Sequence, residues 1–381
     1  MAVNKLSSGK KRWQADWTTP DGRRHRKRFD TKREAEDHEQ ATLRSIRGGT
    51  YIDPKAASKL TVDGLYREWI ERVSTIGASG RKPASPKTVD NYQRCYENYV
   101  APHWKSTPVS RVRYDDVSAW IVGLKGRDGK PAGVTTRREV GLYFGRLMNH
   151  AVKRRYLATN PAKDALGQTD YIPARVKQRK HVYLTMPQLA ALAAACPGFE
   201  LMVILAGTCG LRWGEITALT HGDLKLGTKP YLSVSKAYSE IGGELLLGPT
   251  KTGESRLVPL PRIVADRLAA AIGDASPGTR VFSGGRGSAL RNSTWTKRHY
   301  SPAIARVRAA DPEFPRPTFH DLRHTAVSLA VSSGANIKVV QRIAGHASAT
   351  MTLDTYAGLF DHDLHDSAER LNRALEELDW K

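Results

Sequence analysis

The sequence predicts an α+β fold that is mainly helical and divided into three parts along the chain. Apolar residues recur at helical spacing over most of residues 60–165 and in many segments of residues 181–381. Short β-prone segments separated by turn residues occur near residues 11–29 and 231–260. A length of 381 residues suits two or three domains, each with an ordinary hydrophobic core.

The chain is strongly basic, with a formal net charge of +22 and a pI near 10.0. This excess of positive charge indicates a polyanionic partner. Nucleic acid is the first candidate, because dispersed cations that contact its phosphates release counterions and so favour binding. A membrane surface is the other candidate, but no segment approaches the roughly 18 uninterrupted apolar residues of a membrane span, and no signal peptide is visible. Three scattered cysteines suit neither a disulfide framework nor a zinc site, so we expect reduced thiols in a cytoplasmic protein.

Residues 1–58 are predicted to form a small separate module. Lys11–Thr18 alternates as a strand does, Pro20-Asp21-Gly22 is a turn signal, and Arg23–Phe29 reads as a second strand. Asp30-Thr31 can cap a helix over residues 32–46. The second strand is either a solvated edge that discourages aggregation or a DNA contact. DNA contact is favoured, because β-ribbons fit the major groove. The cations concerned are Arg23, Arg24, Arg26, Lys27 and Arg28.

Residues 60–165 are predicted to form a compact four-helix bundle. Apolar stripes at helical spacing begin after the cap Thr61, and they indicate core packing rather than a cofactor site. The four stripes run through residues 62–73, 89–99, 117–124 and 140–151. A basic cluster on the bundle is either solvated surface or a DNA contact; its members are Arg137, Arg138, Lys153, Arg154 and Arg155.

Residues 166–180 lack periodicity and are predicted to be a basic linker that could lie along a duplex. Its cations are Arg175, Lys177, Arg179 and Lys180.

Residues 181–381 are predicted to form a mixed, mainly helical domain with a small antiparallel sheet. Strands are expected near 231–239, 243–248 and 255–260. Helices are expected near 186–196, 199–208, 213–220, 261–272, 294–309, 319–333, 336–344, 349–357 and 361–378. The last of these is an acidic amphipathic helix, which suits protein packing better than DNA contact.

Polar residues in this third part have the chemistry of a phosphate site. Arg212 follows Gly210-Leu211 at a predicted helix start, where its guanidinium and backbone N–H groups could converge on an oxyanion. Glu215 lies one turn further on and is suited to orienting a neighbouring cation. His320 and Arg323 share a helix face and are expected to project away from the apolar stripe. Metal binding is not expected, because no cluster of His, Cys, Asp and Glu completes a site around them.

Taken in order, these residues resemble the catalytic domain of the tyrosine recombinases, the phage integrase family. The resemblance rests on an ordered set: Arg212, Lys251, His320, Arg323, His346 and Tyr356, with Glu215 as the acidic residue after the first arginine. It covers the full length, because residues 60–165 resemble the family's core-binding domain and residues 1–58 its three-stranded arm-binding domain.

The resemblance implies a mechanism without metal or other cofactor. Tyr356 would attack the scissile phosphate to form a 3′-phosphotyrosine, and Arg212 and Arg323 would hold the non-bridging oxygens. Lys251 would protonate the leaving 5′-oxygen. His320 would assist proton transfer at the tyrosine hydroxyl or bind phosphate, and His346 would donate a hydrogen bond to phosphate. Which histidine acts as the base is left open.

The resemblance also implies partners. We expect double-stranded attachment sites, a homotetramer in the synaptic complex, an excisionase, a host DNA-bending protein and a place on the bacterial nucleoid. The acidic tail would pack either on its own domain or on a neighbouring protomer, and docking on a neighbour is favoured. A chromosome-dimer resolvase is the second candidate within the family, although the basic module argues against it. A type IB topoisomerase and a protein that only binds DNA are two further candidates.

Overall fold

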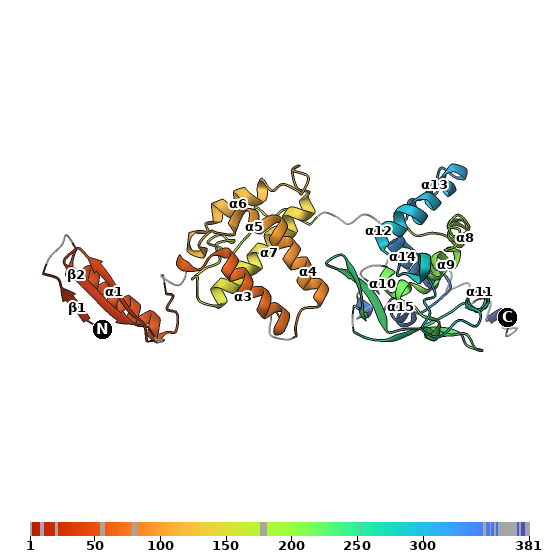
Figure 1. Ribbon diagram of the computed structural model, residues 1–381, viewed down its shortest axis with the longest axis horizontal. Helices are drawn as coiled ribbons and strands as arrows, with labels where there is room; N and C mark the ends of the chain where they lie inside the picture. The colour runs from red at the N-terminus through yellow and green to blue at the C-terminus, as the bar shows by residue number, and fades with distance from the viewer. Residues whose placement is uncertain are drawn as a thin grey trace. The chain divides into compact units, whose positions relative to one another are not determined.

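Figure 1 shows the computed structural model of the chain. The structure describes residues 2–7, 11–19, 22–53, 58–77, 82–175, 181–251, 253–345, 348–350, 352–353, 356, 372 and 375–377. These residues fall into two compact units, Met1–Lys177 and Gln178–Lys381. The predicted α+β class, mainly helical with small antiparallel sheets, is confirmed. The finer division at residues 58, 60 and 165 stays a prediction.

The first unit begins with a three-stranded antiparallel sheet of order β1-β2-β3. Its strands are β1 (Ala2–Lys5), β2 (Trp13–Thr18) and β3 (Arg24–Phe29), and α1 (Lys32–Arg47) packs on the sheet (Figure 1). Thr31 and Glu34 form a capping box at the start of α1, as the sequence indicated for this helix. Pro20 and Asp21 of the predicted turn lie outside the described residues, and the N–H of Thr19 donates to the carbonyl of Arg23 across it at 2.9 Å.

The helical part of the first unit follows the predicted stripes. Its long helices are α3 (Val62–Thr75), α4 (Pro86–Cys95), α6 (Tyr114–Val122) and α7 (Val134–Lys153). A π-helical turn, Tyr96–Val100, continues α4 into the short helix α5 (Ala101–Trp104), and a 3₁₀ turn spans Val109–Arg111. Stripe residues such as Leu65, Val117 and Phe144 are fully buried in one core, so the interpretation as core is confirmed.

The second unit contains two small antiparallel sheets. The first has the order β4-β5-β8, from β4 (Leu224–Lys225), β5 (Tyr231–Val234) and β8 (Arg256–Pro259). The second is a hairpin of β6 (Lys236–Ile241) and β7 (Glu244–Pro249), whose turn uses Gly242 and Gly243 in left-handed conformations. The predicted single strand over 231–239 is therefore wrong in one respect, because the chain leaves one sheet and enters the other at Ser235.

Helices contribute most of the buried core of the second unit (Figure 1). They are α8 (Met186–Ala194), α9 (Glu200–Cys209), α10 (Trp213–Ala218), α11 (Arg262–Ile272), α12 (Asn292–Trp295), α13 (Ser301–Ala310), α14 (Phe319–Ser332) and α15 (Ile337–Ala344). A π-helical turn, Thr296–Tyr300, joins α12 to α13, and 3₁₀ turns span His221–Asp223 and Gly285–Gly287. Most of the predicted 361–378 helix lies outside the described residues.

No helix within the described ranges is both long and apolar enough to cross a bilayer. Cys95, Cys196 and Cys209 are all free, and the last two are buried.

Candidate active site

Arg212 is fixed by the way α9 ends and α10 begins. Gly210 ends α9 in a left-handed conformation with φ 65°, and Arg212 then occupies the N-cap position of α10. The backbone N–H of Arg212 donates to Oε2 of Glu215 at 2.9 Å, and its Nη1 donates to Oε1 of the same carboxylate at 2.9 Å. Glu215 thus orients Arg212, as the sequence indicated. The backbone N–H of Arg212 is satisfied by this carboxylate, so that expected anion-binding group is not free.

Arg256, on β8, was not identified from the sequence. It donates from Nη1 to Oε1 of Glu215 at 3.0 Å and from Nη2 to Oε2 at 2.7 Å. Burial opposes ionisation of Glu215, but hydrogen bonds and charge from Arg256, followed by Arg212, outweigh it and lower its pKa to about 2. Glu215 is therefore a buried carboxylate that stays charged between two guanidinium groups.

Arg323 is buried, which corrects the expectation that it projects away from the core. Its residue is 3% exposed, and the first turns of α14 are buried on nearly every side because α9 and α15 pack against them. Nη1 of Arg323 donates to the carbonyl of Gly210 at 2.6 Å, and Nη2 donates to the carbonyl of Ala344. Burial, then repulsion from Arg212, lowers the pKa of Arg323 to about 9, so the group keeps its charge at neutral pH.

His320, unlike Arg323, is exposed to solvent, and it lies near the guanidinium groups of Arg323 and Arg212. The surrounding protein atoms, then the charges of Arg323 and Arg212, lower its pKa. Nη2 of Arg212 also donates to the carbonyl of Gly345 at 3.3 Å, next to the end of α15. The structure therefore brings Arg212, Glu215, His320 and Arg323 together, with Arg256 as an additional member.

Tyr356 is 1% exposed and lies in a small cluster with Val327, Val331, Val340 and Ala344. Its hydroxyl lies 2.6 Å from Nδ1 of His324, a buried histidine that sequence reasoning passed over. Burial, followed by the neighbouring His181 and His320, lowers the pKa of His324 to about 3, so its ring is neutral and can accept from the hydroxyl. Burial raises the pKa of Tyr356 to about 12 against the opposing charge of Arg323.

His181, Asp321 and His324 form a group that the sequence did not anticipate, since no metal-like cluster was expected. Their potential ligand atoms lie within 4.8 Å of one another. The Asp321 carboxylate, however, accepts from the N–H and hydroxyl of Thr318 at 2.7 and 2.8 Å. The imidazole rings of His181 and His324 stack with their centroids 3.7 Å apart at 27°. The ring nitrogens of stacked rings point outward in nearly parallel planes and do not converge on one point. These contacts fit packing around the cap of α14 better than a metal site.

Lys251 lies on an exposed turn between β7 and β8, at the predicted place. The turn is held by the hydroxyl of Thr250, which donates to the carbonyl of Glu254 at 2.7 Å. His346 lies outside the described residues, but Gly345 ends α15 with φ 57°, as the sequence indicated.

The cations of β3 lie on two faces of the amino-terminal sheet, because successive side chains of a strand point to opposite faces. Rings on β2 and β3, Trp17 and Phe29, contact His38 of α1, so this face is covered. Arg24, Arg26 and Arg28 alternate with it and share the uncovered face, where Arg24 pairs with Asp16 at 2.9 Å. Arg23, at the strand end, and Lys27 are also exposed. Arg175 is exposed, whereas Lys177, Arg179 and Lys180 lie outside the described residues.

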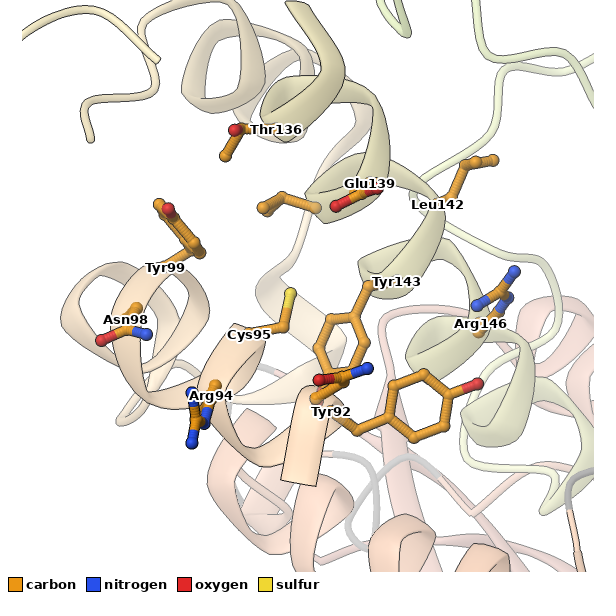
Figure 2. Close-up of a pocket in the computed structure, with 12 residues that line it drawn as sticks. Tyr92, Arg94, Cys95, Asn98, Tyr99, Thr136, Glu139, Leu142, Tyr143 and Arg146 are labelled. Carbon is orange, nitrogen blue, oxygen red and sulfur yellow. The ribbon is translucent and has the colours of Figure 1, made fainter. Parts of the chain in front are cut away.

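A hollow of about 590 Å³ lies between α4 and α7 (Figure 2). Asn98, Arg94 and Arg146 lie around it with Tyr99 and Glu139, which gives the rim several hydrogen-bonding groups. In the basic cluster predicted on this bundle, two members have structural partners. Nη1 of Arg138 donates to the carbonyl of Pro173 at 2.8 Å, and Arg154 pairs with Glu68 at 2.5 Å.

Comparison with known proteins shows what this architecture is similar to. Residues 183–362 match the model of the phage integrase family. An integrase of Streptomyces ambofaciens is 26% identical over 364 residues, covering 88% of this chain and 86% of that protein. Residues 82–397 of the Tn1549 transposon integrase, solved with circular intermediate DNA, superpose with a TM-score of 0.63 at 20% identity. That match covers 83% of this chain and 100% of the solved one.

A lambda integrase tetramer bound to a Holliday junction is also similar, with a TM-score of 0.55 and 18% identity over 91% of this chain and 96% of that chain. The fold is therefore that of these integrases. The resemblance to the tyrosine recombinase, or phage integrase, family is therefore confirmed, and residues 183–362 carry the match to the family model.

Proposed function

We propose that this chain is a site-specific recombinase that integrates and excises mobile-element DNA through a 3′-phosphotyrosine intermediate. The observation that supports this most is the arrangement around α14. Arg323 and His320 of this helix lie close to Arg212, and the neighbouring His324 holds the hydroxyl of Tyr356. Cations for a phosphate and a nucleophile for its phosphorus therefore lie around one helix, α14.

In the proposed reaction, the Tyr356 oxygen attacks the scissile phosphorus while the bond from phosphorus to the 5′-oxygen breaks. Arg212 and Arg323 bind the non-bridging oxygens, where negative charge gathers, and in this way supply the charge stabilisation that metal ions supply in other phosphoryl transfers. Lys251 donates a proton to the leaving 5′-oxygen. The histidines His320 and His346 bind phosphate or take the tyrosine proton.

The resting position of Tyr356 adds one requirement to this reaction. Its hydroxyl is buried against a neutral histidine, and its pKa is raised to about 12. Attack therefore requires the hydroxyl to exchange His324 for the phosphate. The charge of Arg323 opposes the effect of burial and favours the tyrosinate once the exchange has taken place.

Surfaces outside the site suit long duplexes. The uncovered sheet face with Arg24, Arg26 and Arg28 is proposed to bind arm-type DNA. The hollow between α4 and α7 presents amide and guanidinium groups of the kind that read base edges. The linker cations Arg175, Lys177, Arg179 and Lys180 would contact the phosphate backbone of the duplex.

Recombination of two duplexes is proposed to use a homotetramer, in keeping with the lambda integrase tetramer on a Holliday junction. Docking of the acidic tail on a neighbour, and assistance by an excisionase and a host bending protein on the bacterial nucleoid, belong to the same proposal. The amino-terminal module favours an integrase over a chromosome-dimer resolvase.

The test is a covalent-adduct assay on a nicked attachment-site duplex in the presence of a chelator. Wild type is expected to form a denaturant-resistant protein–DNA adduct, and Tyr356→Phe is expected to form none while retaining duplex affinity. Tyr183→Phe, at another tyrosine packed against the same cluster, is the matched control and should still form the adduct. An adduct from Tyr356→Phe, or none from wild type, would rule the proposal out.

A further inference from the structure

Three arginines lie close together in the site: Arg212, Arg256 and Arg323. The ordered set of family residues gives a role to Arg212 and Arg323 but none to Arg256. We propose that Arg256 is a positioning residue for DNA cleavage, which acts through Glu215 to fix the direction and the effective charge of Arg212. The inference deepens the proposed function and rests on it.

The hydrogen-bond geometry of Glu215 supports this role. Each carboxylate oxygen accepts one bond from Arg212 and one from Arg256, at distances between 2.7 and 3.0 Å. Arg256 supplies its pair as a two-pronged fork, the arrangement that fixes a carboxylate plane most firmly. Since the side chain of Glu215 is 1% exposed, water is poorly placed to replace a lost donor. The plane of Glu215, and with it the direction of Arg212, therefore depends on Arg256.

Charge gives a second reason for Arg256. A carboxylate beside Arg212 would cancel much of the attraction between that guanidinium and a phosphate. Arg256 neutralises the carboxylate, so that Arg212 keeps its positive charge toward a ligand. The side chain of Arg256 is 14% exposed, against 26% for Arg212, so Arg212 is the more accessible of the two guanidinium groups.

Arg256 also lies where the pieces of the site converge. It begins β8, five residues after Lys251, so it anchors the strand that follows the lysine turn. A Cβ atom placed on Gly345 would lie 3.0 Å from Nε of Arg256, which shows how closely the end of α15 covers the guanidinium. The same Gly345 carbonyl accepts from Nη2 of Arg212 at 3.3 Å. One side chain thereby ties the lysine strand, the Arg212 cap and the end of α15 together.

The experiment measures single-turnover adduct formation at saturating nicked duplex for Arg256→Gln and Arg256→Lys. Arg256→Gln is expected to slow the step by about tenfold to a hundredfold, as loss of an outer orienting group commonly does, with duplex affinity nearly unchanged. Arg256→Lys keeps the charge but loses the fork, so its rate should lie between the two. Arg291→Gln removes an arginine whose pairing with Glu240 is at the surface, and it should match wild type.

A double-mutant cycle separates positioning from a general structural role. If Arg256 acts through Glu215, Glu215→Gln/Arg256→Gln should be no slower than Glu215→Gln alone, because the second change removes nothing further. Multiplied losses in the double variant would overturn the inference, as would wild-type rates for both Arg256 variants. Should Arg256→Gln fail to fold, the rate of adduct formation by Arg256→Lys relative to wild type replaces it. A slower rate supports the inference, and a wild-type rate overturns it.

The pH profile gives a readout that a merely structural role would not move. The charged groups that face Glu215 are Arg212, Arg256 and, further away, Arg323. Removing Arg256 raises the pKa of Glu215, so the rate of Arg256→Gln relative to wild type should fall as the pH is lowered from 7 to 5. A constant ratio would contradict the inference. Absence of any adduct from wild type would instead defeat the proposed function.

Discussion

The three arginines of the site differ in what holds them, and this difference decides how much charge each offers to a phosphate. Arg212 and Arg256 share the carboxylate of Glu215, whereas Arg323 donates to the main-chain carbonyls of Gly210 and Ala344. A carbonyl orients a guanidinium without cancelling its charge. Arg323 is therefore oriented by neutral main-chain groups and has no carboxylate hydrogen-bonded to it that would reduce its attraction for a phosphate.

At the same scale, His324 makes stability depend on pH. Its pKa falls from 6.5 to about 3 on folding, so the unfolded chain binds more protons between these values. The second unit should therefore lose stability as the pH is lowered from 7 to 5, by up to about 1.4 kcal/mol per pH unit from this residue. Urea unfolding at both pH values measures the loss.

His324→Gln keeps a hydrogen-bond acceptor for Tyr356 but cannot titrate, so it should lose less stability over the same interval. His103→Gln, at an exposed position of the first unit, serves as the control. Equal losses in wild type and His324→Gln would contradict the assignment. Glu215, whose pKa is lowered to about 2, adds a loss of the same sign only at lower pH.

Sequence reasoning found the residue types and their order, because these depend on local chemistry. It could not find burial or partners that arise from packing. Helical spacing assigned Arg323 to the open side of α14, yet neighbouring helices cover that side as well. Arg256 and His324 could not be identified because each depends on a hydrogen bond to a residue distant in sequence. Arg256 bonds to Glu215, and His324 bonds to Tyr356.

At the scale of the elements, α14 depends on its amino-terminal cap. The hydroxyl of Thr318 accepts from the N–H of Asp321 at 3.2 Å, and the Asp321 carboxylate accepts from Thr318 in return. Thr318→Ala should lower the free energy of unfolding of the second unit by about 1 kcal/mol. Thr318→Ser keeps the oxygen and should remain within a few tenths of a kcal/mol of wild type in urea titrations. Equal stability of the alanine and serine variants would show that the cap contributes little.

The elements with strong periodicity were predicted well, including α3, α7, α9 and α14. Elements defined by pairing were predicted less well. The two-residue strand β4 exists because it pairs with β5, and its short length leaves no alternation to read. The π-helical turns after α4 and α12 likewise leave the apolar stripe intact, so spacing alone reads each pair of helices as one.

At the scale of the whole molecule, the sheet of the first unit should matter for integration and not for cleavage. Arg24→Gln/Arg26→Gln/Arg28→Gln removes the cations of the uncovered face. This triple variant should form the core-site adduct at the wild-type rate but integrate poorly. Its arm-site affinity should also depend less steeply on salt, by about 0.9 in the logarithmic slope for each DNA phosphate that the variant no longer neutralises.

A control with the same change in charge is Lys32→Gln/Arg33→Gln/Arg44→Gln, on exposed positions of α1. It should integrate as wild type does. If both triple variants are impaired equally, net charge rather than the sheet face explains the effect, and the arm-binding assignment of this face would be wrong.

The burial of Arg323 beside Arg212 has a thermodynamic consequence for the protein on its own. Arg212 and Arg256 share the single carboxylate of Glu215, Arg323 lies near them, and repulsion from Arg212 is one reason for the lowered pKa of Arg323. Folding without DNA therefore concentrates like charges that the one carboxylate of Glu215 offsets only in part. Any tetrahedral oxyanion that enters should act as a stabilising ligand by mass action, worth about 2.7 kcal/mol at a hundred times its dissociation constant. Sulfate should thus raise the melting temperature of the second unit more than chloride does at equal ionic strength, and Arg212→Gln should abolish the difference.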